Sequence, residues 1–280
     1  MKARVLFGVF GFAFVLLALY VFPPIVLELV VAALCVFATY EVLGSTKLVR
    51  NHLELLLAMA VSLGLAVGHF SILPLRLESV MQGLVLVLLF GSFAIELKYH
   101  DVMKASQVSW AFLGGLAVPY LLLSLLRIFQ MHYHHGPFIV LLPLLAAWGA
   151  DTCALFSGML FGKHKLAPVV SPKKTVEGAV GGVVGGAVLV LIAAVIMNQT
   201  LGLEMPLWSA VVLGAVGAVL GEIGDLSFSV IKRQTGIKDY GHIFPGHGGV
   251  LDRFDSVLFV APFAELLFRV IFNYPLSQIV

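Results

Sequence analysis

The stretch TVEGAVGGVVGGAVLVLIAAVIM, residues 175–197, decides the class of fold. After Glu177 it continues for about 20 residues without a charged side chain, which is the length that an α-helix needs to cross the hydrocarbon core of a bilayer. A chain inside lipid must satisfy its own backbone hydrogen bonds, so a helix is expected here and a lone strand is not. The stretch therefore predicts a membrane-spanning helix.

Small residues recur at regular spacing along this predicted helix and along the apolar segment that follows it. Glycines spaced three or four residues apart let two helices pack closely in lipid. We therefore expect the helices over 175–197 and 207–231 to pack together and to bring together the residues that they carry. The glycines concerned are Gly178, Gly181, Gly182, Gly185, Gly186, Gly214, Gly217, Gly221 and Gly224.

The rest of the chain has the same apolar character. Hydrophobic residues make up 60% of its 280 positions and charged residues only 11%, whereas a soluble domain has about 25% charged residues. We predict an all-α, polytopic integral membrane protein with about nine transmembrane helices. The predicted spans are residues 5–22, 25–40, 53–73, 79–95, 107–129, 137–160, 175–197, 207–231 and 250–272.

The basic residues fix an expected orientation. With nine spans in alternation, all but three of the 17 Lys and Arg residues fall on the side of the N-terminus. The three exceptions are Arg76, Arg127 and Arg269. Because short cytosolic loops carry an excess of Lys and Arg, we expect the N-terminus inside the cell and the C-terminus outside.

Several carboxylates lie inside or at the edge of the predicted spans, where ionisable groups are costly and usually functional. Asp151 lies in the sixth span, Glu222 and Asp225 lie in the eighth, and Asp252 and Asp255 begin the ninth. All five fall in the cytosolic half of the predicted bilayer. We expect them to line one polar basin that is open to the cytosol.

The spacing of four residues in the eighth span supports a common site. Glu222, Asp225, Ser229 and Lys232 are three or four residues apart, so they share one face of a helix. They combine two carboxylates, a hydroxyl and an ammonium group on that face. We interpret the face as one wall of the basin.

Asp252 and Asp255 are three residues apart and are expected to share a helix face in the same way. Carboxylates that are paired in an apolar setting repel each other unless a cation lies between them. Mg²⁺ suits such a place, because it binds one or two carboxylates together with substrate phosphate. Buried polar contacts and a proton relay are the alternatives.

A basic segment precedes the helix over 175–197. Ser171 is a candidate N-cap, Pro172 suits the first helical position, and Lys173 and Lys174 follow. A helix N-terminus with added positive charge binds phosphate well. The alternative is an ordinary juxtamembrane basic loop that faces anionic lipid headgroups.

A glycine-rich loop lies between the last two predicted spans. Lys232, Arg233 and Lys238 precede it, and the sequence PGHGG at 245–249 ends three residues before Asp252. Glycines permit close approach of the backbone to a ligand. We therefore expect His247, Gly248 and Gly249 to take part in a site, whereas a plain turn would not need cations and carboxylates on both sides.

The chain resembles a known family at these segments. The residues SVIKR at 229–233, Lys238-Asp239 and PGHGGVLDRFD at 245–255 resemble the signature of the phosphatidate cytidylyltransferases, or CDP-diacylglycerol synthases, of bacterial type. WGAD at 148–151, FGKHKLAP at 161–168 and SPKKTVEG at 171–178 are similar to further blocks of that family. The chain departs from the family pattern at Leu155, where a Tyr is frequent, and at Glu222, where an apolar residue is expected.

The resemblance implies a reaction and its setting. CTP and phosphatidic acid would give CDP-diacylglycerol and pyrophosphate, with Mg²⁺ as cofactor and a second cation, K⁺, beside it. It also implies a homodimer in the bacterial inner membrane, with membrane lipid and no nucleic acid among its partners. The whole chain, 1–280, would be one membrane domain, with 1–130 as N-terminal helices for lipid access or dimer formation and 148–260 as the catalytic helices and cytosolic loops.

The same resemblance suggests roles for individual residues. The predicted metal ligands are Asp225 and Asp252, with Asp255 and Asp239 as second choices. The predicted catalytic residues are Asp225, Asp252, Lys232, Arg233, Lys238 and His247. The predicted substrate-binding residues are Lys173, Lys174, Ser171, Ser229, Asp239, Gly248, Gly249, Arg253 and Asp151.

Two alternative functions stay open at this point. The first is a CTP-dependent transferase or kinase that acts on another lipid, because the sequence does not show which lipid tail is bound. The second, from a different class, is a transporter with an intramembrane carboxylate relay. Transporters of that kind usually contain an internal repeat with paired broken helices, and the sequence shows no such repeat.

Overall fold

The computed structural model describes residues 15–73, 77–131, 135–243 and 248–272. Two compact units divide the chain. The first contains the residues up to Leu126 together with Gln234–Arg253, and the second contains Arg127–Arg233 together with the segment that begins at Phe254. Each unit is described separately, and the prediction of one membrane domain stays a prediction.

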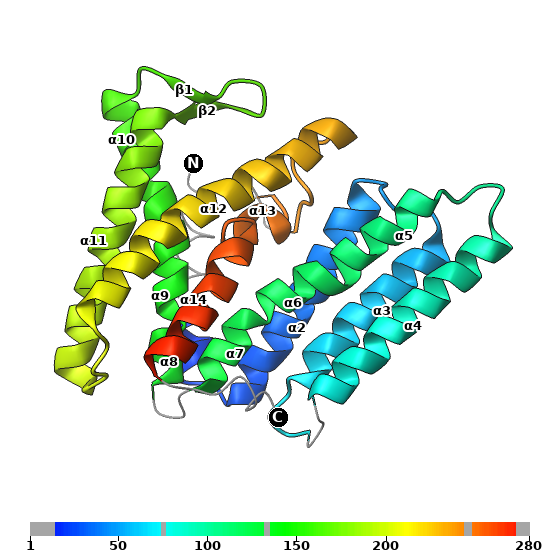
Figure 1. Ribbon diagram of the computed structural model, residues 1–280, viewed down its shortest axis with the longest axis horizontal. Coiled ribbons are helices and arrows are strands. Elements are labelled where there is room, and N and C mark those ends of the chain that lie inside the picture. Colours follow the sequence, from blue (N-terminus) through cyan, green and yellow to red (C-terminus); the bar gives the residue numbers. More distant parts are fainter. Residues whose placement is uncertain (1–14, 74–76, 132–134, 244–247, 273–280) are drawn as a thin grey trace. The chain divides into compact units, whose positions relative to one another are not determined.

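The first unit is a layer of helices that lie side by side (Figure 1). Thr39 joins the layer through its hydroxyl, which donates to the carbonyl oxygen of Gly114 at 2.8 Å. Leu43, Leu65 and Leu122 are among its fully buried side chains. The helices are α2 (Pro24–Tyr40), α3 (His52–Gly68), α4 (Leu77–Lys98), α5 (Ala105–Phe112) and α6 (Val118–Leu122), and α7 (Ser124–Met131) continues from them into the second unit.

Three π-helical turns extend or join helices within the described residues. They are Glu41–Ser45 after α2, Leu113–Ala117 between α5 and α6, and Leu145–Gly149 before α10. A π-turn admits an extra residue without ending the helix, and such turns are frequent at functional sites. The turn at Glu41 is the one that matters for the site below.

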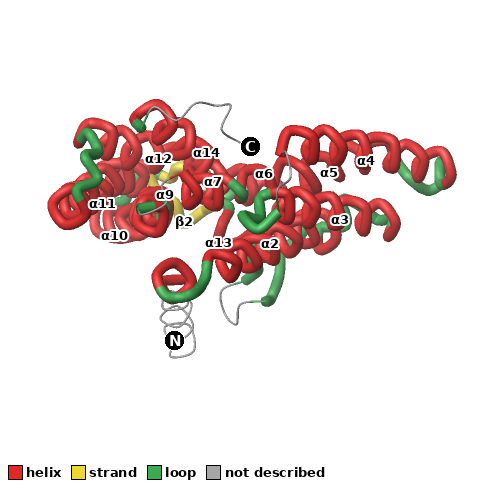
Figure 2. The backbone as a smooth tube through the Cα atoms, turned by 90° about the horizontal axis from the view of Figure 1, so that it is seen from below, coloured by secondary structure: helices red, strands yellow, loops and turns green. Residues whose placement is uncertain are grey.

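The second unit contains long helices and a hairpin. Figure 2 shows α10 beside α11, and the two strands in yellow. The strands pair antiparallel, with Lys165 opposite Thr175 and Ala167 opposite Ser171. The elements are α8 (Gly136–Ile139), α9 (Leu141–Leu144), α10 (Ala150–Phe161), β1 (Lys165–Ala167), β2 (Ser171–Thr175), α11 (Val176–Leu201), α12 (Leu207–Thr235) and α14 (Val257–Ile271), and α13 (Leu251–Phe254) joins the two units.

The hairpin corrects the prediction for the basic segment. Ser171 does not cap a helix and Pro172 does not begin one, because both lie in β2. Thr175 is the N-cap of α11, and its hydroxyl accepts a hydrogen bond from the Gly178 backbone N–H at 3.1 Å. Pairing with β1 gives the backbone of this segment an alternative to the helix. Proline is tolerated in such an edge strand, where its missing N–H costs little.

The glycines of α11 mostly face a different neighbour from the one predicted. A Cβ atom added at Gly182 would lie 3.1 Å from the carbonyl oxygen of Ala150 on α10. Only near Gly186 does α11 closely approach α12, where a Cβ added at Gly214 would lie 2.6 Å from the Cα of Ala187. The prediction that the glycines bring α11 to α12 is therefore correct at one crossing, and the rest of the ladder packs α11 on α10.

The last predicted span, 250–272, is broken near its start. It begins with the single turn α13, and the long helix α14 starts only at Val257. One oxygen of Asp255 accepts the Ser256 backbone N–H at 2.8 Å, and such local bonds from Asp compete with helix formation. The prediction that Asp252 and Asp255 share one helix face is therefore wrong.

The predominantly helical membrane class is confirmed. Within the described ranges, six helices are long and apolar enough to cross a membrane, and α3 is a shorter apolar helix of 17 residues. The six are Pro24–Ser45, Leu77–Lys98, Ala105–Met131, Gly136–Phe161, Val176–Leu201 and Leu207–Thr235. The predicted number of nine stays a prediction, and most of its first span, 5–22, lies outside the described residues.

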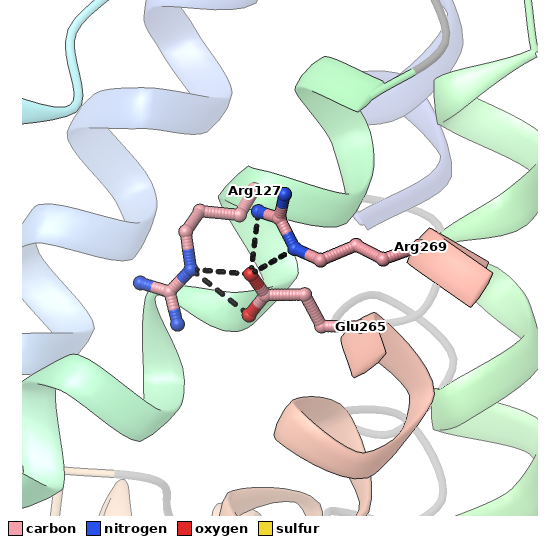
Figure 3. A network of polar contacts seen from close by, with 3 residues as sticks. All are labelled: Arg127, Glu265 and Arg269. Atoms are coloured by element: carbon pink, nitrogen blue, oxygen red, sulfur yellow. Dashed lines mark hydrogen bonds and ion pairs between the residues drawn. The ribbon is translucent and has the colours of Figure 1, made fainter. Parts of the chain in front are cut away.

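A buried ionic network joins α7 and α14 in the second unit. Figure 3 shows Glu265 between Arg127 and Arg269. The Arg127 Nε donates to both carboxylate oxygens at 2.9 Å, and Arg269 donates to one of them from Nη2 at 2.8 Å and from Nε at 3.1 Å. All three side chains are less than 10% exposed. Because each charged group here has an opposite partner, the network fixes the position of the two helices.

Candidate functional site

An acidic cluster lies in the second unit, made of Asp151, Lys174, Glu222, Asp225 and Asp255. At its centre the Lys174 Nζ lies 2.8 Å from Glu222 Oε2 and 2.6 Å from Asp225 Oδ2. The two carboxylates are one turn apart on α12, and the lysine comes from β2. The hairpin thus delivers a cation to the carboxylates that the sequence placed on one helix face.

The alternation of side chains along β2 explains which lysine enters the cluster. Successive residues of a strand point to opposite faces. Lys174 is half-buried between its two carboxylates, whereas Lys173 is exposed. The sequence predicted equal roles for these two lysines, and the structure distinguishes them.

The predicted face of α12 is confirmed around Asp225. The Ser229 hydroxyl donates to Asp225 Oδ1 at 3.3 Å. Lys232 is buried one turn further on, close enough for its charge to act on Asp225. Asp225 is therefore surrounded by a hydroxyl and two cations.

Asp255 and Asp151 complete the cluster from two other segments. Asp255, which is 6% exposed, lies within hydrogen-bonding reach of Asp225. The hydroxyl of its neighbour Ser256 donates to Asp151 Oδ2 on α10 at 3.5 Å. Four of the five predicted basin carboxylates thus gather in one unit.

The charge of Lys174 is secured by its surroundings. Burial on its own would lower the pKa of the ammonium group, but the carboxylates of Asp225 and Glu222 outweigh that effect and hold the pKa above its ordinary value. Lys174 lies in β2, outside the apolar helices. It is therefore a fixed positive charge at neutral pH.

Asp252, the fifth carboxylate, lies in the first unit and organises a loop. Its Oδ2 accepts the Tyr240 N–H at 2.7 Å and the Gly249 N–H at 3.0 Å. Gly248 has a φ of +85°, and a Cβ atom there would lie 2.8 Å from the Asp252 carboxylate. Glycine is therefore required at 248 both for its backbone angle and for space. A basin that also includes Asp252 stays a prediction.

A residue that the sequence analysis did not single out joins this loop. Glu41, at the start of the first π-turn, accepts the Val250 N–H at 3.0 Å and the Leu251 N–H at 2.7 Å. The same rule that selected the five carboxylates, an ionisable group inside or at the edge of an apolar span, would have selected Glu41, which directly follows the predicted span 25–40. It would also have selected Glu28, Glu54 and Glu265, all of which are buried.

The remaining predicted residues are more dispersed. Arg233 is exposed, and its Nε donates to the carbonyl oxygen of Val170 at 3.3 Å, which ties the end of α12 to the hairpin. Gly249 is buried against Glu41. Ser171 is half-buried, and His247 lies outside the described residues. The exposed members are Lys173, Lys238, Asp239 and Arg253.

The acidic cluster by itself does not form a ready metal site in the described part of the chain. Glu222 Oε1 is buried and has no hydrogen-bond partner in the described part of the chain. A cation, the Lys174 ammonium, already lies between Glu222 and Asp225. Among the described residues, no group of three or more His, Cys, Asp or Glu side chains is placed so that it could hold a metal ion without further ligands. Mg²⁺ would therefore need oxygens from a substrate phosphate or from water, as it usually does.

Comparisons with known proteins agree on one family. The sequence pattern described as the cytidylyltransferase family matches residues 2–271. A phosphatidate cytidylyltransferase of Haemophilus influenzae is 32% identical over 283 residues, which cover 94% of this chain and 96% of the relative. One of Staphylococcus aureus is 34% identical over 255 residues, which cover 90% and 95%. One of Staphylococcus saprophyticus is 42% identical over 132 residues, which cover 47% and 49%.

Proposed function

This chain belongs to the cytidylyltransferase family, and from that membership we propose that it is a CTP:phosphatidate cytidylyltransferase of phospholipid synthesis. A phosphate oxygen of phosphatidic acid forms a bond to the α-phosphorus of CTP. The bond from that phosphorus to the oxygen that bridges to the β-phosphate breaks, and pyrophosphate leaves. The product is CDP-diacylglycerol.

One observation supports this proposal above the others. Segments that are distant in the sequence meet at Asp225: Lys174 from the hairpin, Ser229 from α12, and Asp255 from the break before α14. Each of them lies in a stretch that resembles the family. A cluster of carboxylates with a fixed cation is suited to a reaction between two phosphates.

The proposed reaction needs positive charge near the two phosphates more than it needs a general base. A phosphate monoester has its second pKa near 6, so the attacking oxygen is already anionic at neutral pH. The obstacle is repulsion between two anions, and phosphoryl transfer enzymes overcome it by positioning and by positive charge. Lys174 and Lys232 supply that charge beside Asp225, and the more exposed Lys173, Arg233 and Lys238 are proposed to attract the triphosphate.

Asp225, Asp255 and Asp252 are the residues proposed to hold Mg²⁺. When bound, the ion would neutralise charge on the phosphate oxygens and orient them. Asp252 is already oriented by two backbone N–H groups. The hydroxyl of Ser229 donates a hydrogen bond to one oxygen of Asp225. This bond orients the Asp225 carboxylate. A second cation, K⁺, is proposed beside the same carboxylates from the family resemblance.

The direct test is pyrophosphate release by the purified protein in detergent micelles. Release is expected only when CTP, Mg²⁺ and phosphatidic acid are all present. Asp252→Asn is expected to abolish it while the protein stays folded. Asp101→Asn, at an exposed aspartate that pairs only with His100 among the described contacts, is the matched control and should retain activity.

The same assay separates the rivals. Pyrophosphate release with a polyprenyl phosphate and none with phosphatidic acid would identify another lipid as the substrate. No CTP-dependent release with any lipid would remove the enzyme proposal and favour a carrier. Normal turnover in Asp252→Asn would contradict the proposed role of the Asp252 carboxylate.

We also propose that the protein lies in the bacterial inner membrane, with its N-terminus and the acidic cluster on the cytosolic side. The distribution of Lys and Arg supports this orientation. Lys163→Cys and Lys238→Cys, in a Cys153→Ala background, should react with an impermeant thiol reagent only from the cytosolic side. Cys35 can remain because it is buried. Reaction of both sites from outside would overturn the orientation.

A homodimer is proposed from the family resemblance alone. The mass of the detergent-solubilised protein, measured by light scattering with the detergent contribution subtracted, should be twice 30.1 kDa. A monomeric mass that retains full pyrophosphate release would remove this proposal without affecting the reaction.

A further inference from the structure

We infer that Glu41 is a positioning residue for the reaction: it anchors the glycine-rich loop and thereby fixes Asp252. This inference rests on the proposed function, because Asp252 matters for catalysis only if that function holds. Glu41 lies 209 residues before the loop in the sequence. It lies outside the signature segments quoted from 148–178 and 229–255, although the family match itself extends over residues 2–271.

The contacts show a carboxylate shared between two consecutive backbone groups. Glu41 Oε1 accepts the Val250 N–H at 3.0 Å, and Oε2 accepts the Leu251 N–H at 2.7 Å. Hydrogen bonds from backbone N–H groups to a carboxylate are stronger than those between neutral groups. The side chain is only 1% exposed, so water cannot replace it as the acceptor for these two N–H groups.

The loop is shaped to accept this carboxylate. A Cβ atom added at Gly249 or at Gly241 would collide with the Glu41 carboxylate. Both glycines therefore let the backbone pass directly against Glu41. Gly249 belongs to the segment that resembles the family signature, and the contact with Glu41 gives the glycine there a physical cause.

Two carboxylates divide three consecutive N–H groups of the loop between them. The Gly249 N–H donates to Asp252, and the next two, from Val250 and Leu251, donate to Glu41. Moving the backbone at 250 and 251 therefore moves Asp252 and its bond to Gly249. Glu41 acts on the reaction through Asp252 and is not proposed to touch substrate.

Glu41 is the C-cap of α2 and the first residue of the π-turn Glu41–Ser45. The Thr46 hydroxyl donates to the carbonyl oxygen of Val42 at 2.5 Å and closes the end of the turn. The turn thus holds Glu41 against the loop from within a buried helix end.

The test compares Glu41→Gln with Glu54→Gln. The first substitution keeps the size of the side chain but presents an NH₂ group to one of the two backbone donors. Glu54 is also a fully buried glutamate of the first unit. It accepts a hydrogen bond from the Ser92 hydroxyl at 2.6 Å, and a glutamine oxygen can keep that bond.

We expect Glu41→Gln to lower kcat by about 10- to 100-fold, since small displacements of reacting groups cost that much. The Mg²⁺ concentration that gives half of the maximal rate should rise. Glu54→Gln should stay within about twofold of the wild type, because its hydrogen bond survives.

Hydrogen exchange of the loop amides supplies a readout that does not depend on activity. Glu41→Gln should increase the exchange rates of the Val250 and Leu251 amide protons by at least about tenfold, as expected for local opening. Compared with Glu41→Gln, the shorter carboxylate of Glu41→Asp should restore part of the protection and part of kcat. A fall in kcat with unchanged protection, or lost protection with unchanged kcat, would overturn the inference. If the wild type releases no pyrophosphate, the proposed function fails, and exchange still decides whether Glu41 anchors the loop.

Discussion

Two ionic groups of the second unit, the buried arginine network and the half-buried acidic cluster, differ in whether all their carboxylate oxygens have partners among the described residues. In the network of Arg127, Glu265 and Arg269, both oxygens of the one carboxylate are bonded to guanidinium groups. In the acidic cluster, carboxylates outnumber the bound cations, and one oxygen of Glu222 has no hydrogen-bond partner in the described part of the chain. The first arrangement is suited to holding helices together, and the second is the place proposed for a further cation.

Replacing a carboxylate by an amide should therefore lower activity in the acidic cluster and stability in the arginine network. The larger effect is expected in the acidic cluster. Asp225→Asn removes one negative charge without changing the shape of the side chain. We expect pyrophosphate release to fall by at least about a thousandfold, comparable with the loss of a key electrostatic group in other enzymes. The thermal unfolding midpoint in detergent should stay within a few degrees of the wild type. Retained turnover would contradict the role of Asp225.

Glu265→Gln makes the equivalent change in the arginine network. It leaves two buried guanidinium groups without their counter-charge, and removing one member of a buried ionic group costs about 3 to 5 kcal/mol. We expect a clear drop in the thermal unfolding midpoint, measured in detergent. The folded fraction should keep the wild-type kcat. A variant that is fully stable but inactive would reverse the comparison.

Lys174→Met tests the cation within the acidic cluster. The methionine removes the charge but keeps much of the apolar stem, so Glu222 and Asp225 are left to repel each other. We expect kcat/KM for CTP to fall by about 10- to 100-fold, similar to the loss of one preorganised charge. Lys104→Met, at an exposed lysine of the first unit, is the control. Equal activity in the two variants would show that Lys174 does not act on the substrate.

The smallest expected effect is a dependence on pH. The pKa of Lys174 is raised in the folded protein, so its ion pairs contribute stability that is complete below the unfolded pKa of about 10.4 and lost as pH rises through the folded value. The difference in unfolding midpoint between wild type and Lys174→Met should be present at about pH 8 to 9 and should shrink as the pH rises above about 10. A difference that is unchanged well above about pH 10 would mean that the ammonium group is not its source.

Part of this architecture could be predicted from the sequence alone. The long apolar helices follow from hydropathy, and the face of α12 that carries Asp225 and Ser229 follows from helical spacing. Both features are local, since they depend on the period of a single helix. The break before α14 is local too. It was not predicted because Asp252 and Asp255 have the spacing of a continuous helix.

The hairpin and the role of Glu41 could not be predicted in the same way. Ser-Pro-Lys-Lys-Thr at 171–175 suits a helix start as well as a strand, and only pairing with residues 165–167 decides between them. Glu41 is one acid in an apolar segment, and its partners at 250 and 251 are backbone groups that carry no sequence signal. Both depend on contacts between segments that the sequence alone does not connect.

The bonds of Glu41 have a consequence for anyone who wishes to reduce this protein to a minimal fragment. Residues 148–260 contain every segment that resembles the family signature, and they would be the natural piece to excise for screening or for transplanting into another scaffold. That piece would leave the Val250 and Leu251 N–H groups without their acceptor. Any shortened or chimeric version must therefore retain α2 and its π-turn, or supply a carboxylate in the place of Glu41.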